Sequence, residues 1–402
     1  MAISTTWTEL YEDLHRHPEL SFEEERTAAI VADSLRTAGF EVETGVGRTG
    51  VVGVLRNGDG PTVLVRADMD ALPVTERTGL PYTSAVEGVA HACGHDVHVT
   101  CLLAACAELA ATGDTWAGTL LAVFQPAEEV GAGARAMLDD GLYERYGTPV
   151  VVLGQHVAPI PAGTIGLHDG PSFAALDNLA ITLHGVGGHG SSPHTTVDPV
   201  VLAASTVLRL QTVVSREISP SDFAVVTVGR LDAGTKANII PETARMEVNV
   251  RSYQESVRAR VLAAIERIVR GEAVTAGAPR EPEIDHFESC DPVVNDPAAC
   301  AATRPALAST GALVIDPGPV PGSEDVGLFA TAADCPCVYW LLGGADPALF
   351  EGLTTIRQFA ERVATIPSNH SPEFAPVPDP TLELGVAALT AATRHWLPVA
   401  GA

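Results

Sequence analysis

Short apolar runs alternate with helical stretches in the first part of the chain, and this alternation constrains the fold more than any other sequence feature. The runs are apolar on both faces, as strands of a parallel sheet are when helices cover both sides. They lie at residues 51–55, 63–67, 119–124 and 150–153, with helical spacing at 99–111 and 132–138. We therefore expect an α/β domain with a mainly parallel sheet and with active-site residues beyond the carboxyl ends of its strands.

Two helices are expected before these strands. Apolar residues recur at helical spacing from Trp7 to Leu14, and Pro18 ends the pattern. Ser21 and Glu24 have the spacing of a capping box, which predicts the start of a second helix that ends at Gly39.

The middle of the chain has a different pattern, in which strands and helices follow the order β-α-β-β-α-β. The strands are expected at 179–183, 224–228, 244–251 and 284–287, and the helices at 199–214 and 255–269. This order predicts a ferredoxin-like α+β domain inserted into the first domain. A strand at 338–342 and a helix at 382–395 return to the first pattern. The inserted domain is therefore expected at residues 178–288, between two parts of the first domain at 1–177 and 289–402.

Charge and cysteine content exclude several classes of protein. The chain has 24 Lys and Arg against 50 Asp and Glu, a net charge of −26, which argues against nucleic-acid and acidic-membrane partners. No apolar run approaches the roughly 18 residues of a membrane span, and the first ten residues lack the order of a signal peptide. The seven cysteines form no small-domain disulfide framework. We expect a cytoplasmic protein with reduced thiols.

The densest group of potential ligands lies between His91 and His98. Cys93 and His95 are one residue apart, so they point to the same side of an extended segment, and Gly94 lets the backbone pass close to an ion. Zinc, manganese, nickel or cobalt would accept this pair. The alternative is that the histidines are solvated loop residues and that Cys93 is a small buried apolar residue.

Glu128 and Glu129 follow the run at 119–124 directly. Adjacent side chains of an extended backbone diverge, so one can bind a metal while the other faces a water molecule as a general base. A solvated acidic pair at a helix start is the alternative. His156 follows the next strand and His370 lies in another loop of the same domain, which favours the metal site. Asp68 ends the strand at 63–67, where it either orients a metal-bound imidazole or caps the loop.

These segments together resemble the metal-dependent amidohydrolases that include hippurate hydrolase, N-acyl-amino-acid amidohydrolase and auxin-conjugate hydrolase. They belong to a wider di-metal peptidase family. The resemblance covers nearly the whole chain, and the matching segments occur in the family's order. They are His17–Leu20, Ala67–Pro73, His91–Asp96, Gln125–Glu129, Gly187–His194, Asn238–Pro241, Ser323–Asp325 and Asn369–Pro372.

The resemblance implies a di-metal hydrolase domain with an inserted lid and dimerisation domain. It implies that Glu128 is the general base and that two divalent ions, zinc or manganese before cobalt or nickel, are bound by Cys93, His95, Glu129, His156 and His370. Cys93 then stands where the wider family has a bridging aspartate. Arg66 replaces the wider family's first metal-binding histidine, so the metal set must be the one that contains Cys93.

The inserted domain is also implied to contribute to the reaction. His189 matches the histidine that, in dimeric relatives, reaches the partner's active site and stabilises the oxyanion. Asn238 lies in a second motif of this domain, and Arg251 matches by strand position an arginine that binds substrate carboxylates; a surface ion pair is the alternative for this arginine. A homodimer is therefore expected.

The expected activity is hydrolysis of the amide bond of N-acyl amino acids, such as N-acetyl or N-benzoyl conjugates. A metallo-dipeptidase or aminopeptidase is one alternative, although the sequence identifies no pocket for a free α-amino group. A catalytically silent metal-binding protein on the same scaffold is another.

Overall fold

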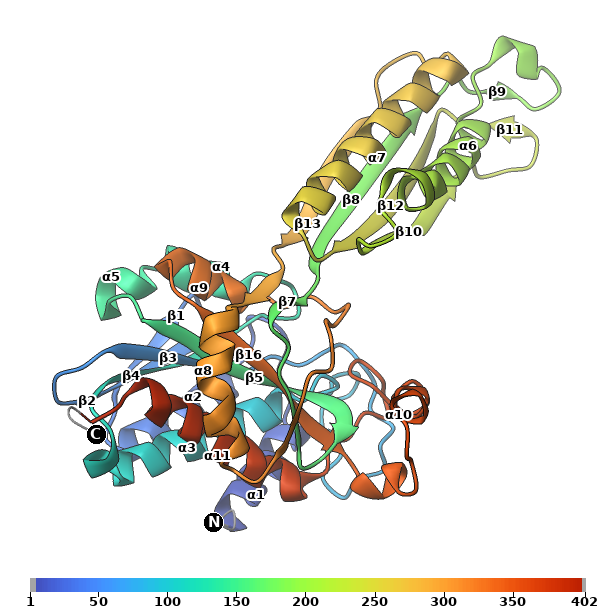
Figure 1. Ribbon diagram of the computed structural model, residues 1–402. Coiled ribbons are helices and arrows are strands. Elements are labelled where there is room, and N and C mark those ends of the chain that lie inside the picture. Colours follow the sequence, from blue (N-terminus) through green and yellow to red (C-terminus); the bar gives the residue numbers. More distant parts are fainter. Residues whose placement is uncertain (1–4, 400–402) are drawn as a thin grey trace. The chain divides into compact units, whose positions relative to one another are not determined.

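The computed structural model describes residues 5–399, and the chain divides into two compact units (Figure 1). Unit 1 comprises the chain up to Gly170, Val294–Gly318 and the part from Asp325 onward. Unit 2 comprises Pro171–Val293 and Pro319–Glu324. The sequence placed the borders after residues 177 and 288 and did not separate the short segment Pro319–Glu324.

Unit 1 is built on an eight-stranded sheet in the order β1-β2-β4-β3-β5-β16-β6-β15. The strands are β1 (Glu41–Val46), β2 (Gly50–Asn57), β3 (Thr62–Asp68), β4 (Gly118–Gln125), β5 (Val151–Pro161), β6 (Thr164–Gly166), β15 (Leu313–Ile315) and β16 (Cys337–Ala345). The central strands β4, β3, β5 and β16 are parallel, whereas β1 and β2 join one side in antiparallel pairing. The α/β prediction is confirmed, and the apolar runs are the buried strands of this sheet.

The helices of unit 1 include one that is buried almost throughout, α3 (His95–Ala111). It packs on β3 and β5 and is covered by α1 (Thr5–Arg16), α2 (Glu25–Thr37) and α11 (Pro378–Trp396). The other helices are α4 (Gly133–Asp139), α5 (Leu142–Tyr146), α8 (Pro297–Ala308), α9 (Gly327–Ala333) and α10 (Ile356–Val363). Because α3 has neighbours on all sides, its first residue, His95, is held firmly against the sheet.

Two element boundaries differ from the sequence prediction. Helix α3 begins at His95, four residues before the expected start, because Gly94 takes the left-handed conformation (φ 83°) and turns the chain into the helix. Strand β5 continues to Pro161, so His156 lies inside the strand instead of following it. Both differences place a potential ligand on a regular element, where its backbone is fixed by hydrogen bonds.

The capping box predicted from Ser21 and Glu24 is wrong. Glu24 precedes α2 but makes no side-chain capping bond, and its carboxylate accepts from the Ala127 amide at 2.8 Å. The Ser21 hydroxyl donates to Asp70 at 2.7 Å. Glu19 takes the capping role instead, because its two carboxylate oxygens accept from the amides of Arg26 and Thr27 in the first turn. Tertiary contacts with distant loops have replaced the local pairing.

Unit 2 is a four-stranded antiparallel sheet in the order β10-β12-β8-β13. Its strands are β8 (Ala175–His184), β10 (Ala224–Ala233), β12 (Thr243–Ser252) and β13 (Glu283–Cys290), and Figure 1 shows α6 (Pro199–Thr212) and α7 (Glu255–Ala276) on one face. The element order confirms the ferredoxin-like prediction. Asp198 caps α6 as expected, because its carboxylate accepts from the Val200 amide.

Four short strands complete the description. The strands β9 (Gly188–His189) and β11 (Ile239–Ile240) form a separate antiparallel ribbon in unit 2. The strands β7 (Gly170–Phe173) and β14 (Val293–Asn295) span two of the four borders between the units in the sequence. Among residues 5–399, no helix combines the length and the apolarity that crossing a membrane requires.

Candidate metal centre

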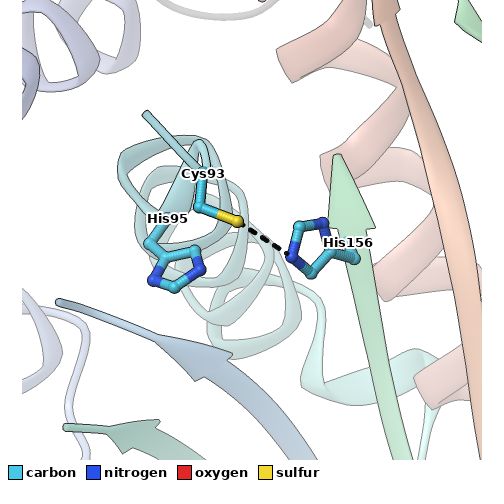
Figure 2. A group of neighbouring side chains, drawn as sticks. All are labelled: Cys93, His95 and His156. Atoms are coloured by element: carbon cyan, nitrogen blue, oxygen red, sulfur yellow. Dashed lines mark hydrogen bonds between the residues drawn. The ribbon is translucent and has the colours of Figure 1, made fainter. Parts of the chain in front are cut away.

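Five side chains that are far apart in the sequence meet in unit 1. Ligand atoms of Cys93, His95 and His156 lie within 4.8 Å of one another, and so do those of Cys93, Glu129 and His370. Cys93 belongs to both groups. Figure 2 shows Cys93 and His95 at the start of α3, with His156 facing Cys93 from β5. The structure thus brings together all five residues that the resemblance implied as ligands.

The spacing of the ligand atoms suits metal ions. The Cys93 Sγ lies 3.6 Å from His156 Nε2, and His370 Nε2 lies 3.3 Å from Glu129 Oε2. Two ligands held at roughly 2.0–2.3 Å from one ion in tetrahedral geometry are about 3.5 Å apart. Each group can therefore hold one ion, with the sulfur common to both.

A tight turn directs Cys93 and His95 toward the same point. The sequence suggested an extended segment here, but the backbone turns at Gly94 into the helix. A Cβ atom on Gly94 would lie 2.4 Å from a methyl group of Val157, so glycine is required for space as well as for its positive φ.

A second turn carries the acidic pair at the end of β4. Ala127 has a left-handed backbone (φ 50°), and the amides of Glu128 and Glu129 both donate to the Asp70 carboxylate, at 3.1 and 3.0 Å. The two glutamate side chains do not diverge as expected. One oxygen of each, Glu128 Oε2 and Glu129 Oε1, lies 3.9 and 3.8 Å from His95 Nε2.

Unsatisfied buried atoms show that this donor set fits a cation. The Nε2 of His95 and the Oε1 of Glu129 are buried without a hydrogen-bond partner among the described residues, while His95 Nδ1 lies 3.3 Å from Asp70. Leaving a buried polar atom unpaired costs about 1–3 kcal/mol, and a bound divalent ion would remove that penalty. A mixed set of sulfur, nitrogen and oxygen donors suits ions of borderline softness such as zinc.

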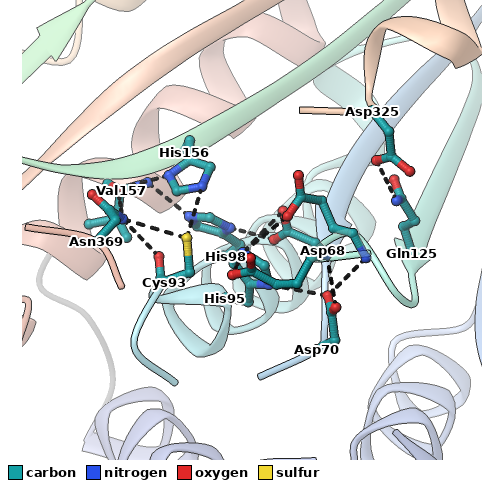
Figure 3. A network of polar contacts seen from close by, with 12 residues as sticks. Asp68, Asp70, Cys93, His95, His98, Gln125, His156, Val157, Asp325 and Asn369 are labelled. Carbon is teal, nitrogen blue, oxygen red and sulfur yellow. Dashed lines mark hydrogen bonds and ion pairs between the residues drawn. The ribbon is translucent and has the colours of Figure 1, made fainter. Parts of the chain in front are cut away.

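His98 lies close to the centre but is not available as a ligand. Its Nδ1 bonds Asp68 at 2.5 Å, and its Nε2 accepts from the Val157 amide at 2.8 Å. Burial lowers the pKa of His98 to about 4, so the ring stays neutral. Its role is to fix Asp68 (Figure 3).

Asp68 is completely buried beside the ligands. Its Oδ2 lies 3.7 Å from His95 Nε2 and accepts from Arg66 at 2.6 Å. Burial raises the pKa of Asp68, but Arg66, His95 and His98 outweigh it and hold the pKa well below its usual range. Asp68 is therefore an ionised carboxylate that supports His95.

The Arg66 guanidinium donates hydrogen bonds to side chains beside the candidate metal centre. Besides Asp68, its guanidinium donates to Gln125 at 2.8 Å and to Asp325 at 3.3 Å. Gln125 in turn donates to Asp325 at 2.6 Å. These bonds tie the ends of β3 and β4 to the segment before α9.

The pKa values of Cys93 and His370 determine the form in which each side chain would meet a metal ion. Burial and the Glu129 carboxylate raise the pKa of Cys93, but His156 and His370 outweigh them and bring it to about 6. Hydrogen bonds with Cys93 and Glu129 raise the pKa of His370 to about 10. At neutral pH the sulfur is therefore a thiolate, the form that binds metals, and an ion held by His370 would displace the proton of that ring.

The predicted residues of unit 2 form a separate group. His189 lies on β9 and is exposed, and its Nδ1 accepts from the Ser191 amide at 3.1 Å. The Asn238 carbonyl accepts from the Gly190 amide at 2.9 Å, so His189 and Asn238 share one ribbon. Arg251 lies on β12, where it donates to Ser323 at 2.8 Å and to Asn249 at 3.2 Å.

Sequence reasoning missed several residues that hold the centre in place. Asn369 donates from its side-chain amide to the carbonyl oxygens of Cys93 and Val157, both at 3.1 Å, and the His370 amide donates to Ala92 at 2.8 Å. Asn369 belongs to the matching segment Asn369–Pro372 and directly precedes a potential ligand, but neither signal gave it a role.

A buried ion-pair cluster supports the start of α3. His15 Nδ1 bonds Asp96 at 2.6 Å, and its Nε2 lies 3.2 Å from Glu76. Burial lowers the pKa of His15, but the Asp96 and Glu76 carboxylates outweigh it and raise the pKa to about 10. The imidazolium thus links α1 and the loop around Glu76 to the residue next to His95.

Comparison with known proteins gives one consistent result. The model of "Peptidase family M20/M25/M40" matches residues 64–361. An N-acetyl-L-cysteine deacetylase of Bacillus subtilis (strain 168) is 36% identical over 318 residues, which cover 79% of this chain and 75% of the relative. A hippurate hydrolase of Campylobacter jejuni is 42% identical over 260 residues, which cover 64% of this chain and 67% of the relative. The crystal structure of B. subtilis YXEP, described as a dinuclear metal binding peptidase, has a TM-score of 0.80 at 30% identity and covers 98% of both chains.

The His15 cluster generates a pH-dependent prediction. Because the pKa of folded His15 is about 10 against 6.5 for an ordinary histidine, its stabilisation is complete below pH 6.5 and is lost as the pH rises toward 10. We predict that the stability difference between wild type and His15→Gln shrinks across this window, by roughly 1.4 kcal/mol for each pH unit at most.

Urea unfolding followed by tryptophan fluorescence measures this difference, since all four tryptophans lie in unit 1. The variant His168→Gln, which alters a surface pair with Asp316, is the control. A difference that stays constant between pH 7 and 9.5 would show that His15 is not protonated in the folded chain.

Proposed function

The chain belongs to peptidase family M20/M25/M40, and from this membership we propose that it hydrolyses the amide bond of N-acyl amino acids to a carboxylic acid and a free amino acid. The observation that carries the proposal is the Glu128 carboxylate, which lies 3.9 Å from His95 beside a complete set of five potential ligands. The names of two relatives, the deacetylase of N-acetyl-L-cysteine and the hydrolase of hippurate, support this substrate class.

We propose that Cys93, His95, Glu129, His156 and His370 hold two divalent ions, zinc or manganese before cobalt or nickel. When bound, such ions lower the pKa of a water molecule and polarise an amide carbonyl. Asp68 keeps His95 in place through its buried charge, and Asp70 holds the turn from which Glu129 projects. The thiolate of Cys93 is common to both ligand groups.

Glu128 acts as the proton carrier in this proposal. Its amide is fixed by Asp70, so the direction of its side chain is set by the turn. The carboxylate takes a proton from the attacking water and returns it to the nitrogen of the leaving amino acid. Its side chain is buried except for a small part, which excludes bulk water from competing for that proton.

We propose that the chain forms a homodimer through unit 2 and that His189 acts in the partner's active site. Helix α6 exposes Val201 (65%) and Leu208 (72%), and β10 is an edge strand, both of which suit a protein interface. Because His189 Nδ1 accepts from an amide, its ring proton is on Nε2, which can donate to the oxyanion. Asn238 supports this ribbon, and Arg251 is the proposed contact for the substrate carboxylate.

The cysteines suggest where the enzyme works. Within the described residues none of the seven forms a disulfide and six are buried, a pattern typical of proteins from a reducing compartment. We therefore propose a cytoplasmic enzyme.

The base assignment predicts a loss of turnover without a loss of metal. Glu128→Gln should lower kcat on N-acetyl- and N-benzoyl-amino acids by about 10²–10⁴-fold, because the amide cannot carry the proton. Metal analysis of the same preparation should match wild type. Full activity of this variant would exclude Glu128 as the base, and a wild-type enzyme that cleaves dipeptides but no N-acyl amino acid would exclude the substrate class.

The shared sulfur predicts unequal effects on metal content. Cys93→Ala should lower the content for both sites, whereas His156→Ala and His370→Ala should each affect mainly one site, because each histidine belongs to one of the two groups that contain Cys93. Elemental analysis after dialysis measures the ratio of metal to protein. The buried thiol of Cys101, also on α3, provides the control variant Cys101→Ala. Equal losses in all three ligand variants would contradict the shared position of Cys93.

The proposed interface predicts that Leu208→Glu separates the dimer, because a charge on α6 would be buried without a partner. Light scattering of the purified protein measures the mass. Val274→Glu is the matched control, since Val274 is 74% exposed on the other helix of unit 2. A monomeric wild type, or a Leu208→Glu dimer, would reject this interface.

A further inference from the structure

The turn between α1 and α2 runs beside two loops of the metal centre. Leu20 pairs with Ala71 in a parallel bridge, and the Ala71 amide donates to the Glu19 carbonyl at 2.8 Å. This contact brings Ser21 and Glu24, the residues of the mistaken capping box, next to the end of β3 and the turn after β4. The proposed reaction has so far given neither residue a role.

Glu24 is completely buried and uses both carboxylate oxygens. Its Oε1 accepts from the amides of Phe22 at 2.9 Å and Ala127 at 2.8 Å. Its Oε2 accepts from the Thr49 hydroxyl at 2.5 Å. Glu24 therefore connects its own turn, the loop before β2 and the turn Ala127–Glu129, called the acidic turn below.

Three consecutive amides of the acidic turn donate to two carboxylates. Ala127 donates to Glu24, while Glu128 and Glu129 donate to Asp70. Successive amides that point to one side form a concave site for negative charge. Here the protein fills that site with its own side chains, and the left-handed backbone of Ala127 allows this arrangement.

The hydrogen bonds of these amides also affect the side chains of Glu128 and Glu129. The direction in which Glu128 and Glu129 project depends on the orientation of the peptide groups that carry them. A displacement of about 1 Å at a reacting group can lower the rate by about 10²-fold. The two carboxylates are those of Glu24 and Asp70. Glu24 is farther from the acidic pair, because it contacts the Ala127 amide and not the amides of Glu128 and Glu129.

We propose that Glu24 is a positioning residue for hydrolysis, which holds the Ala127 amide and thereby aims Glu128 and Glu129 at the metal centre. This inference rests on the proposed function, in which Glu128 is the base and Glu129 a ligand. What the turn needs from Glu24 is an acceptor oxygen at the place of Oε1, and its negative charge is not required.

The surroundings of Glu24 agree with a role that does not depend on charge. Burial raises the pKa of this carboxyl, so its charge is less favourable here than in water. A glutamine keeps the carbonyl oxygen at the same place, and its amide group can donate to the Thr49 hydroxyl. An aspartate keeps the charge but is one carbon shorter, which withdraws the acceptor by about 1.5 Å.

Two variants of Glu24 therefore separate position from charge. Glu24→Gln should retain most of the wild-type kcat, whereas Glu24→Asp should lower kcat by about 10–100-fold, with KM close to wild type. Divalent-metal affinity, measured by titration calorimetry with manganese or zinc, should fall in Glu24→Asp by about 10-fold and stay unchanged in Glu24→Gln. Thermal unfolding of each variant reports its stability.

Glu19→Gln and Glu19→Asp are the matched controls. Glu19 lies on the same turn and also accepts two amides, but these belong to α2 and not to the acidic turn. The Glu19 variants should lower thermal stability and leave kcat and metal affinity unchanged.

Each outcome bears on the proposal. If Glu24→Asp loses stability as Glu19→Asp does but keeps its kcat and metal affinity, Glu24 is only structural and the proposal is overturned. If Glu24→Gln loses as much kcat as Glu24→Asp, the charge is required and the acceptor argument is wrong. If wild type hydrolyses no N-acyl amino acid, the proposed function has failed, and the two metal affinities alone then decide whether Glu24 positions Glu129.

Discussion

One buried carboxylate, that of Asp70, joins four of the segments around the candidate metal centre. It accepts from Ser21 before α2 and from the amides of Glu128 and Glu129 after β4, and it lies 3.3 Å from His95 at the start of α3. Burial raises the pKa of Asp70, but contacts with His95, Ser21 and the Glu129 amide outweigh it and lower the pKa. The charge is retained in the interior because so many donors face it, and those donors are the parts of the site.

The sequence predicted those parts of the structure that depend on burial and on local order. The apolar runs became buried strands because both faces of these strands are covered, as Val63 and Leu64 in β3 show. The order of elements in unit 2 followed from alternation along β8 and from the Asp198 cap. The resemblance implied all five potential ligands. Four of them lie in short segments that can be matched directly, and His156 was placed by its position at the next strand.

The parts that could not be predicted depend on contacts between distant turns. Ser21 and Glu24 satisfy a local rule for helix starts, yet both side chains bond loops that lie 49 and 103 positions away in the chain. Such bonds require backbone conformations like the positive φ of Ala127. A positive φ at a residue other than glycine cannot be predicted from the residue type. The same limit explains His98, which looks like a ligand by type but has both nitrogens engaged by Asp68 and Val157.

The common position of Cys93 in both ligand groups has a consequence for oxidative stress. Peroxide converts an accessible thiolate to a sulfenic acid, which is a poor metal ligand, and a thiol reductant reverses the change. If both groups bind an ion, as proposed above, a single oxidation at the shared sulfur removes one ligand from each site at once. The proposed activity would then respond to the redox state of the surroundings through this one residue.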